Sequence, residues 1–141
     1  MHLEKQFDVK CARQRVAEIA SQDETLTGLF ADSDTEIVES RGNRKTTCTH
    51  YTALGRSGTA TFHFTFEDDG NVSFEKVCDG NVWRELRGTL RFEERQGKTR
   101  VRIAMDGRTR SLVPEFTIKS PMRDQIEDMA AALRLRLEES G

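Results

Sequence analysis

Three neighbouring residues, Cys48, His50 and Tyr51, carry the side chains in this sequence that are best suited to chemistry. An imidazole or a phenol can give or take a proton, so His50 and Tyr51 are candidate acid–base residues. The sequence places no carboxylate or second histidine to orient them, and threonines on both sides make ordinary strand residues the alternative. Because no G-x-S-x-G, phosphate-loop or H-E-x-x-H motif occurs, we assign no catalytic residue and favour binding over catalysis.

Cys48 and His50 stand two residues apart, a spacing that puts two possible zinc ligands on one face of a strand. His63 and Cys78 are the other candidate ligands, but they fall on opposite expected faces of neighbouring strands. Closely spaced pairs of the C-x₂-C kind are absent. We therefore predict no metal site and no cofactor.

Arg84 shares alternation parity with Val82, Leu86 and Leu90, so a regular strand would turn its guanidinium toward the core. An unpaired buried charge is costly, and a ligand carboxylate or phosphate would satisfy it. The alternative is that Arg84 lies at the end of the strand, where it reaches water or pairs with Glu115.

Period-two alternation and turn sequences predict strands over most of the chain. The expected strands are 2–9, 35–40, 44–54, 59–67, 72–78, 82–93 and 99–105, with turns at 41–43, 55–58, 68–71, 79–81 and 95–98. Such short links allow only antiparallel neighbours, so the middle of the chain is expected to be a meander.

Helical spacing appears in three places. We expect a helix over 11–22 and a second short piece around Leu26 and Phe30, with Asp23 or Thr25 as its cap. A proline-marked linker, 113–120, leads to a long amphipathic helix over 120–139, with Ser120 as N-cap and Pro121 in the first position.

The strand patterns also predict which side chains face the core. Phe62, Phe64 and Phe66 should point inward, as should Leu86 with its parity partners, which leaves Trp83 facing water. For residues 46–54 neither face is clearly apolar, so the orientation of His50 and Tyr51 stays open.

Length and composition set further bounds. The 141 residues fit one domain, 1–141, and a formal charge of −2 with no basic stripe argues against a nucleic-acid partner. No secretory signal and no apolar run of about 20 residues are visible, so we expect no transmembrane segment. Three widely spaced cysteines suit a reducing cytoplasm, while a homodimer is left open.

The predicted order, one strand, two short helices, six antiparallel strands and a long helix, resembles the helix-grip fold of the SRPBCC superfamily. That superfamily includes START lipid-transfer domains, plant pathogenesis-related allergens, polyketide cyclases and an accessory component of carbon monoxide dehydrogenase. Residues 97–101, Gly-Lys-Thr-Arg-Val, look like its penultimate turn, and residues 121–126, Pro-Met-Arg-Asp-Gln-Ile, are similar to the closing helix of bacterial members. The resemblance spans nearly the whole chain and implies an α+β fold with a curved sheet around the last helix.

The resemblance further implies a cavity between sheet and helix that holds a lipid, sterol or polyketide-like molecule, for sequestration or transfer. Phe30 and the short helices would then form part of its gate. A cyclase- or isomerase-type enzyme, an accessory protein-binding subunit and a solidly packed core are the alternatives. The expected ligand-binding residues are Phe62, Phe64, Phe66, Phe74, Arg84, Phe92, Met105, Met122, Ile126, Met129, Leu133, His50 and Tyr51.

Overall fold

The structure is a computed structural model that describes residues 1–30, 32–53, 56–78 and 82–140. Its helices are α1 (Arg13–Ala20), α2 (Asp23–Thr27) and α3 (Glu115–Ser140). Its strands are β1 (His2–Val9), β2 (Asp34–Arg41), β3 (Arg44–Ala53), β4 (Arg56–Phe66), β5 (Val72–Lys76), β6 (Trp83–Arg95) and β7 (Lys98–Thr109).

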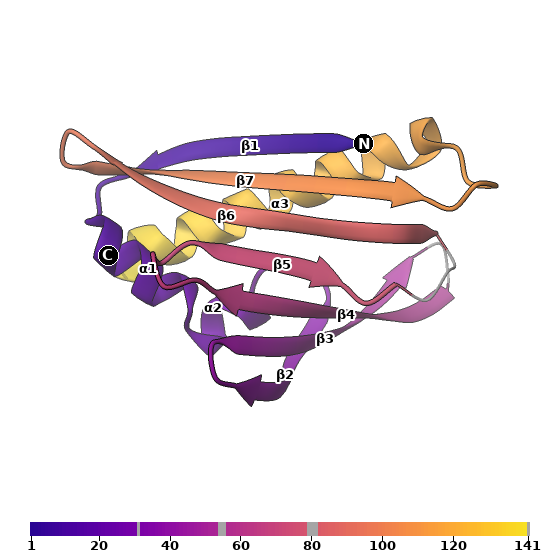
Figure 1. Cartoon of the computed structure of the whole chain (residues 1–141), viewed down its shortest axis with the longest axis horizontal. Helices are drawn as coiled ribbons and strands as arrows, with labels where there is room; N and C mark the ends of the chain where they lie inside the picture. The colour runs from indigo at the N-terminus through magenta and orange to yellow at the C-terminus, as the bar shows by residue number, and fades with distance from the viewer. Residues whose placement is uncertain (31, 54–55, 79–81, 141) are drawn as a thin grey trace.

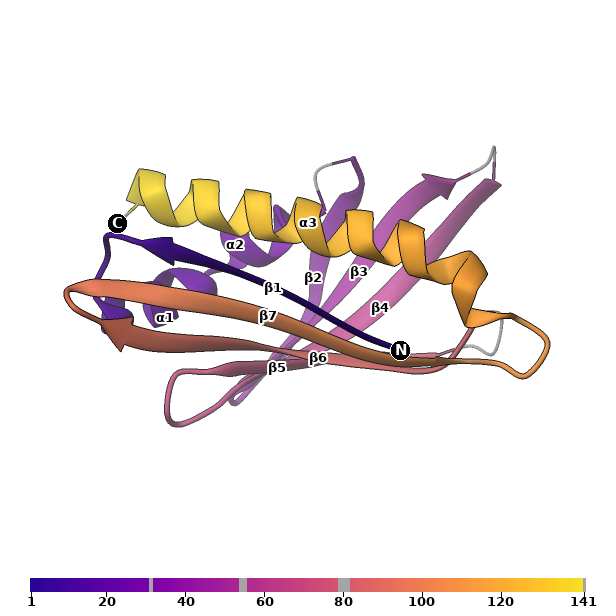
Figure 2. The same cartoon turned by 90° about the horizontal axis from the view of Figure 1, so that it is seen from above.

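The strands form one antiparallel sheet in the order β1-β7-β6-β5-β4-β3-β2 (Figure 1). β2 to β7 follow one another as the expected meander, and β1 closes the far edge by pairing with β7. The sheet is strongly twisted, and α3 lies along one face of it (Figure 2). The prediction of an α+β helix-grip fold is therefore confirmed.

The core lies between α3 and the concave face of the sheet. Met122, Ile126, Met129, Leu133 and Leu137 form the buried stripe of α3, as the spacing predicted. The inward residues of β7, among them Val101 and Ile103, are also fully buried. Within the described residues, no helix combines the length and apolar character needed to cross a bilayer.

The start of α3 differs from the prediction. The helix begins at Glu115 instead of Ser120, so Pro121 lies inside it and residues 115–120 are helix, not linker. Proline has no N–H for the carbonyl of Thr117, four residues earlier, and its ring crowds that carbonyl. The axis of α3 accordingly changes direction in its first turns (Figure 2).

The cap predicted for α2 is wrong as well. Gln22 precedes the helix without a side-chain cap bond, and Asp23 is its first residue. The Thr25 hydroxyl instead donates to the Ile19 carbonyl at 2.6 Å, which ties α2 to the end of α1. Asp23 accepts a hydrogen bond from Lys45 Nζ at 2.7 Å, so its carboxylate joins α2 to β3.

Three of the five predicted turns have the left-handed backbone that glycine favours. Gly42, Gly70 and Gly97 have φ of 58°, 91° and 82°. The turn predicted at 55–58 is partly wrong, because Ser57 and Gly58 lie in β4, while residue 55 is outside the described residues. The turn at 79–81 and residue 54 of the predicted third long strand also lie outside them.

Candidate ligand-binding cavity

A cavity of about 300 Å³ lies at one end of the concave face, where residues from the first turns of α3 and residues of β3, β4 and β6 line the same space. The loop after α2 supplies another part of its wall. The residues that line it are Phe30, Ser33, Thr49, Tyr51, Thr59, Ala60, Phe62, Lys76, Val82, Trp83, Leu86, Ile118 and Gln125. Segments that lie far apart in the sequence, from Phe30 to Gln125, thus meet around one space.

Aromatic rings form the apolar side of the cavity. Phe30, which follows α2, stacks on Phe62 of β4 with ring centroids 5.8 Å apart and planes 26° from parallel. Phe62 also contacts Phe64 and Phe74, at centroid distances of 6.3 and 6.4 Å. Such a cluster gives the wall a rigid aromatic base that continues into the core.

Trp83 faces the cavity, which contradicts the predicted alternation of β6. The pairing of β6 with β7 shifts register between Trp83 and Glu85, so the parity of the strand changes at this point. The indole is only 7% exposed and packs over Gly107, where a Cβ atom would lie 2.5 Å from the Trp83 ring. The bulge and the glycine together make room for the largest side chain of the wall.

The same shift determines the position of Arg84, whose side chain is exposed instead of turned into the core. Arg84 is not among the described residues that line the cavity. The alternative in which it reaches water near the end of the strand describes this geometry, so the structure does not bring Arg84 to this cavity.

The inner face of β3, left open by the sequence, carries Thr47, Thr49 and Tyr51. Thr49 Oγ1 lies 2.8 Å from Thr35 Oγ1 on β2, and the Tyr51 ring covers Gly58 across the strand pair. Thr47 is fully buried, and its hydroxyl has no hydrogen-bond partner among the described residues. Thr49 and Tyr51, but not Thr47, line the cavity, so this side of it carries hydroxyl groups.

Lys76 is the charged residue among the described residues that line the cavity. It pairs across the strands with Phe62, so its side chain leaves β5 beside the aromatic wall. Gln125 of α3 and the Tyr51 phenol add hydrogen-bonding groups. The cavity can thus hold an apolar body and bind a polar or anionic end.

Of the thirteen predicted ligand-binding residues, Phe62 and Tyr51 line the cavity. His50 is on the opposite face of β3 and is exposed. Most of the others are buried side chains that pack against one another as core. They are Phe64, Phe74, Phe92, Met105, Met122, Ile126, Met129 and Leu133.

Phe66 is half-buried, with Lys45 Nζ 5.7 Å from the centre of its ring. Where the buried residues named above lie, away from the cavity, the space between the sheet and α3 is filled, as in the alternative of a solidly packed core.

Sequence reasoning missed Trp83, Lys76, Ile118 and Gln125 as wall residues. The pattern gave no sign of a one-residue bulge in β6, and it placed Ile118 in a linker. Phe30 was expected as part of a gate, and the structure puts it in the wall.

No protein-family model matches this sequence, and no curated protein matches it. Solved structures do match. The Zhui aromatase/cyclase from Streptomyces sp. R1128 has a TM-score of 0.79 at 16% identity, covering 99% of this chain and 93% of its own.

A START superfamily protein from Mycobacterium smegmatis has a TM-score of 0.75 at 14% identity, covering 98% of this chain and 97% of its own. A STAR-related lipid transfer protein from Xanthomonas axonopodis has a TM-score of 0.68 at 15% identity, with coverages of 96% and 85%. The chain therefore has the SRPBCC, or START-like, fold that its sequence resembles.

Proposed function

We propose that this protein binds a small, mainly apolar molecule in the cavity between its sheet and the first turns of α3, and sequesters or transfers it. The observation that carries the proposal is the wall itself. Phe30, Phe62 and Trp83 enclose one side of an unfilled space, while Tyr51 and Lys76 lie on its polar side. Ligand sites typically combine such an apolar enclosure with a few polar groups that fix orientation.

The volume of about 300 Å³ narrows the class of ligand. Ligand pockets span roughly 300–1,000 Å³, so this one is at the small end. A compact ring system or a single short acyl chain suits the space better than a two-chain lipid. Lys76 favours a carboxylate or phenolate end over a cationic one.

The rival functions have less support. An enzyme of the cyclase or isomerase type would need His50, Tyr51 or Arg84 in the cavity together with a partner that orients it. Tyr51 lines the cavity, but among the described residues no histidine or carboxylate lines it to orient the phenol. An accessory protein-binding subunit would be expected to have a filled core, whereas this end of the core is open. The START-like neighbours bear on the fold alone.

Filling the cavity tests the proposal. Trp83 is the single tryptophan and lines the wall, so its fluorescence reports an apolar probe that enters. We expect a small aromatic carboxylate to quench it saturably in the wild type. Ala60→Phe, which adds a ring from the sheet side, should abolish the response while the far-ultraviolet circular dichroism stays unchanged.

Ala131→Phe is the matched control, because Ala131 is an exposed residue on α3 that does not line the cavity. It should bind the probe like the wild type. Equal quenching in Ala60→Phe and the wild type, with both folded, would show that the probe binds elsewhere and contradict the proposal. Native mass spectrometry of freshly purified protein should also show a small molecule of matching size.

A further inference from the structure

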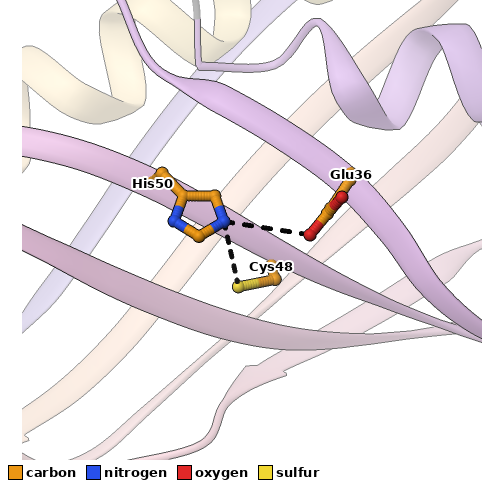
Figure 3. Close-up of side chains that lie close together, drawn as sticks. All are labelled: Glu36, Cys48 and His50. Atoms are coloured by element: carbon orange, nitrogen blue, oxygen red, sulfur yellow. Dashed lines mark hydrogen bonds and ion pairs between the residues drawn. The ribbon is translucent and has the colours of Figure 1, made fainter.

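Three metal-binding side chains converge on the face of the sheet that points away from the cavity (Figure 3). Glu36 of β2 lies directly opposite Cys48 of β3, and His50 follows two residues later on the same face. The strand register therefore supplies the third donor that Cys48 and His50 lack in the sequence. Neither His63 nor Cys78 belongs to this group.

The three donor atoms are spaced for a shared ion more than for hydrogen bonds. Cys48 Sγ lies 4.0 Å from His50 Nε2, and His50 Nε2 lies 3.8 Å from Glu36 Oε1. The imidazole–carboxylate distance exceeds a normal N–H···O bond. In a tetrahedral zinc site, bond lengths of 2.0–2.3 Å put neighbouring ligand atoms roughly 3.3–3.6 Å apart. These two distances would need to shorten by about half an ångström, and all three donor atoms lie within 4.8 Å of one another.

The direction of the contacts excludes a simple nucleophile relay. In a Cys–His–acid relay the thiol and the carboxylate use different ring nitrogens, so that the acid orients the base. Here one nitrogen, Nε2 of His50, faces both the thiol and the carboxylate (Figure 3). Three donor atoms of metal-binding types that all lie within 4.8 Å of one another suit a shared ion better than a relay.

We propose that Glu36, Cys48 and His50 bind one divalent zinc-class ion. The thiol gives its proton to solvent on binding, and a thiolate, a carboxylate and a neutral imidazole together balance a charge of two. The mixture of sulfur, nitrogen and oxygen ligands suits zinc or cobalt(II) better than magnesium or calcium.

Side-chain exposures of 56% for His50 and 64% for Glu36 leave the fourth position open to water. This site is independent of the cavity, since the two lie on opposite faces of β3.

Cobalt(II) is the probe, because a bound thiolate gives a charge-transfer band and tetrahedral coordination gives strong visible absorption. Full-length protein kept reduced by a non-thiol reductant should bind one cobalt ion per chain and release it to zinc. Glu36→Gln, Cys48→Ser and His50→Gln each remove one exposed or half-buried ligand and should each weaken zinc binding by about tenfold or more.

Cys78→Ser and His63→Gln are matched controls that leave the cluster intact, and both should retain the cobalt spectrum. The proposal is overturned if the charge-transfer band persists in Cys48→Ser, or if Glu36→Gln binds zinc as tightly as the wild type. One ion per two chains would also overturn it, because the site would then be formed between molecules.

Discussion

Lys76 is the charged side chain among the described residues of the cavity wall, so it bears on whether the cavity prefers anionic or neutral ligands. An ammonium group beside an aromatic wall attracts an anion more strongly than it would in open solvent, because fewer waters compete for it. Its place could not be read from the sequence, where Lys76 looks like an ordinary polar residue at the end of a strand. Its pairing with Phe62 across β4 and β5 is what brings it to the wall.

Lys76→Met should therefore separate anionic from neutral ligands. A charge-assisted hydrogen bond contributes about 1.5 kcal/mol at the lower end of its range, so the variant should bind a medium-chain carboxylate about tenfold more weakly. Binding of the primary alcohol of the same length should change little. Titration calorimetry measures both.

Lys119→Met is the control, since Lys119 is exposed and does not line the cavity. Equal weakening of carboxylate and alcohol by Lys76→Met would show that the lysine acts through packing and not through charge.

At the residue scale, the sequence predicted part of the site for physical reasons. Phe62 belongs to a clear alternation, so its inward direction followed from the pattern. Thr49 and Tyr51 lie on a strand with threonines on both faces, so only the observed register shows which face points inward. Alternation predicted that Arg84 faces the core and Trp83 faces water, and the structure shows the reverse. The bulge in β6 shifts the strand by one residue, which exchanges the two faces on its far side.

At the scale of elements, β6 and β7 act as a pair that presents Trp83. The bulge between Trp83 and Glu85 turns the indole inward, and Gly107 on β7 leaves the space beneath it. Bulges are over-represented next to functional sites, where they redirect a side chain. The wall of the cavity thus depends on two local features, one on each strand.

Gly107→Ala should displace the indole. The new Cβ would lie 2.5 Å from the Trp83 ring and 3.0 Å from Leu86 Cδ1, which neither side chain can accept in place. Overpacking of this kind costs about 1–3 kcal/mol of stability. Because Trp83 is the only tryptophan, its emission should shift to the red as the ring becomes more exposed.

Ala104→Ser, a similar small change on the other face of β7, should leave both stability and emission near the wild type. An unaltered emission spectrum in Gly107→Ala would mean that the strands adjust without moving the indole, contrary to this prediction.

At the scale of the whole molecule, the first strand of the chain completes the sheet by pairing with the last strand. β1 pairs with β7, and His2 Nδ1 lies 2.6 Å from Asp106 Oδ1 across that edge. The hydrogen bond to Asp106, aided by Glu4, raises the pKa of His2 above its ordinary value of 6.5. The folded state therefore binds a proton at His2 more tightly than the unfolded chain.

The contribution of His2 to the free energy of unfolding therefore depends on pH in a known direction. The stabilisation is complete below pH 6.5 and is lost as the pH rises through the higher pKa of the folded state. Asp106→Asn should lower the pKa of His2, measured by NMR titration, and flatten the fall in stability on the alkaline side. Since the pair is exposed, the effect on unfolding should be small.

Asp124→Asn, an exposed change on α3, should leave the His2 titration as it is in the wild type. If His2 titrates at its ordinary value in both the wild type and Asp106→Asn, the pairing across the β1–β7 edge does not exist in solution.

The architecture was more predictable than the site, because many weak signals agree on it. Alternation, turn residues and the order of elements all indicate a meander closed by a helix, and an error of a few residues changes nothing in that arrangement. The cavity depends on single residues at the ends of helices and strands. There tertiary packing, and not the local sequence pattern, determines where a side chain points. The start of α3 shows this: a proline suggested a boundary, yet the helix continues through it.

Pro121 affects how easily the first residues of α3 can move away from the cavity. Without an N–H at Pro121, residues 115–120 are joined to the remainder of α3 by fewer backbone hydrogen bonds, and Ile118 of the cavity wall belongs to this short piece. Moving it outward would break the ion pair of Glu115 with the N-terminal amine and the packing of Ile118 against the core, but not the buried stripe of the helix, which starts at Met122. For the ligand binding proposed above, we expect the opening of this helical turn, and not unfolding of the whole domain, to set the barrier to release.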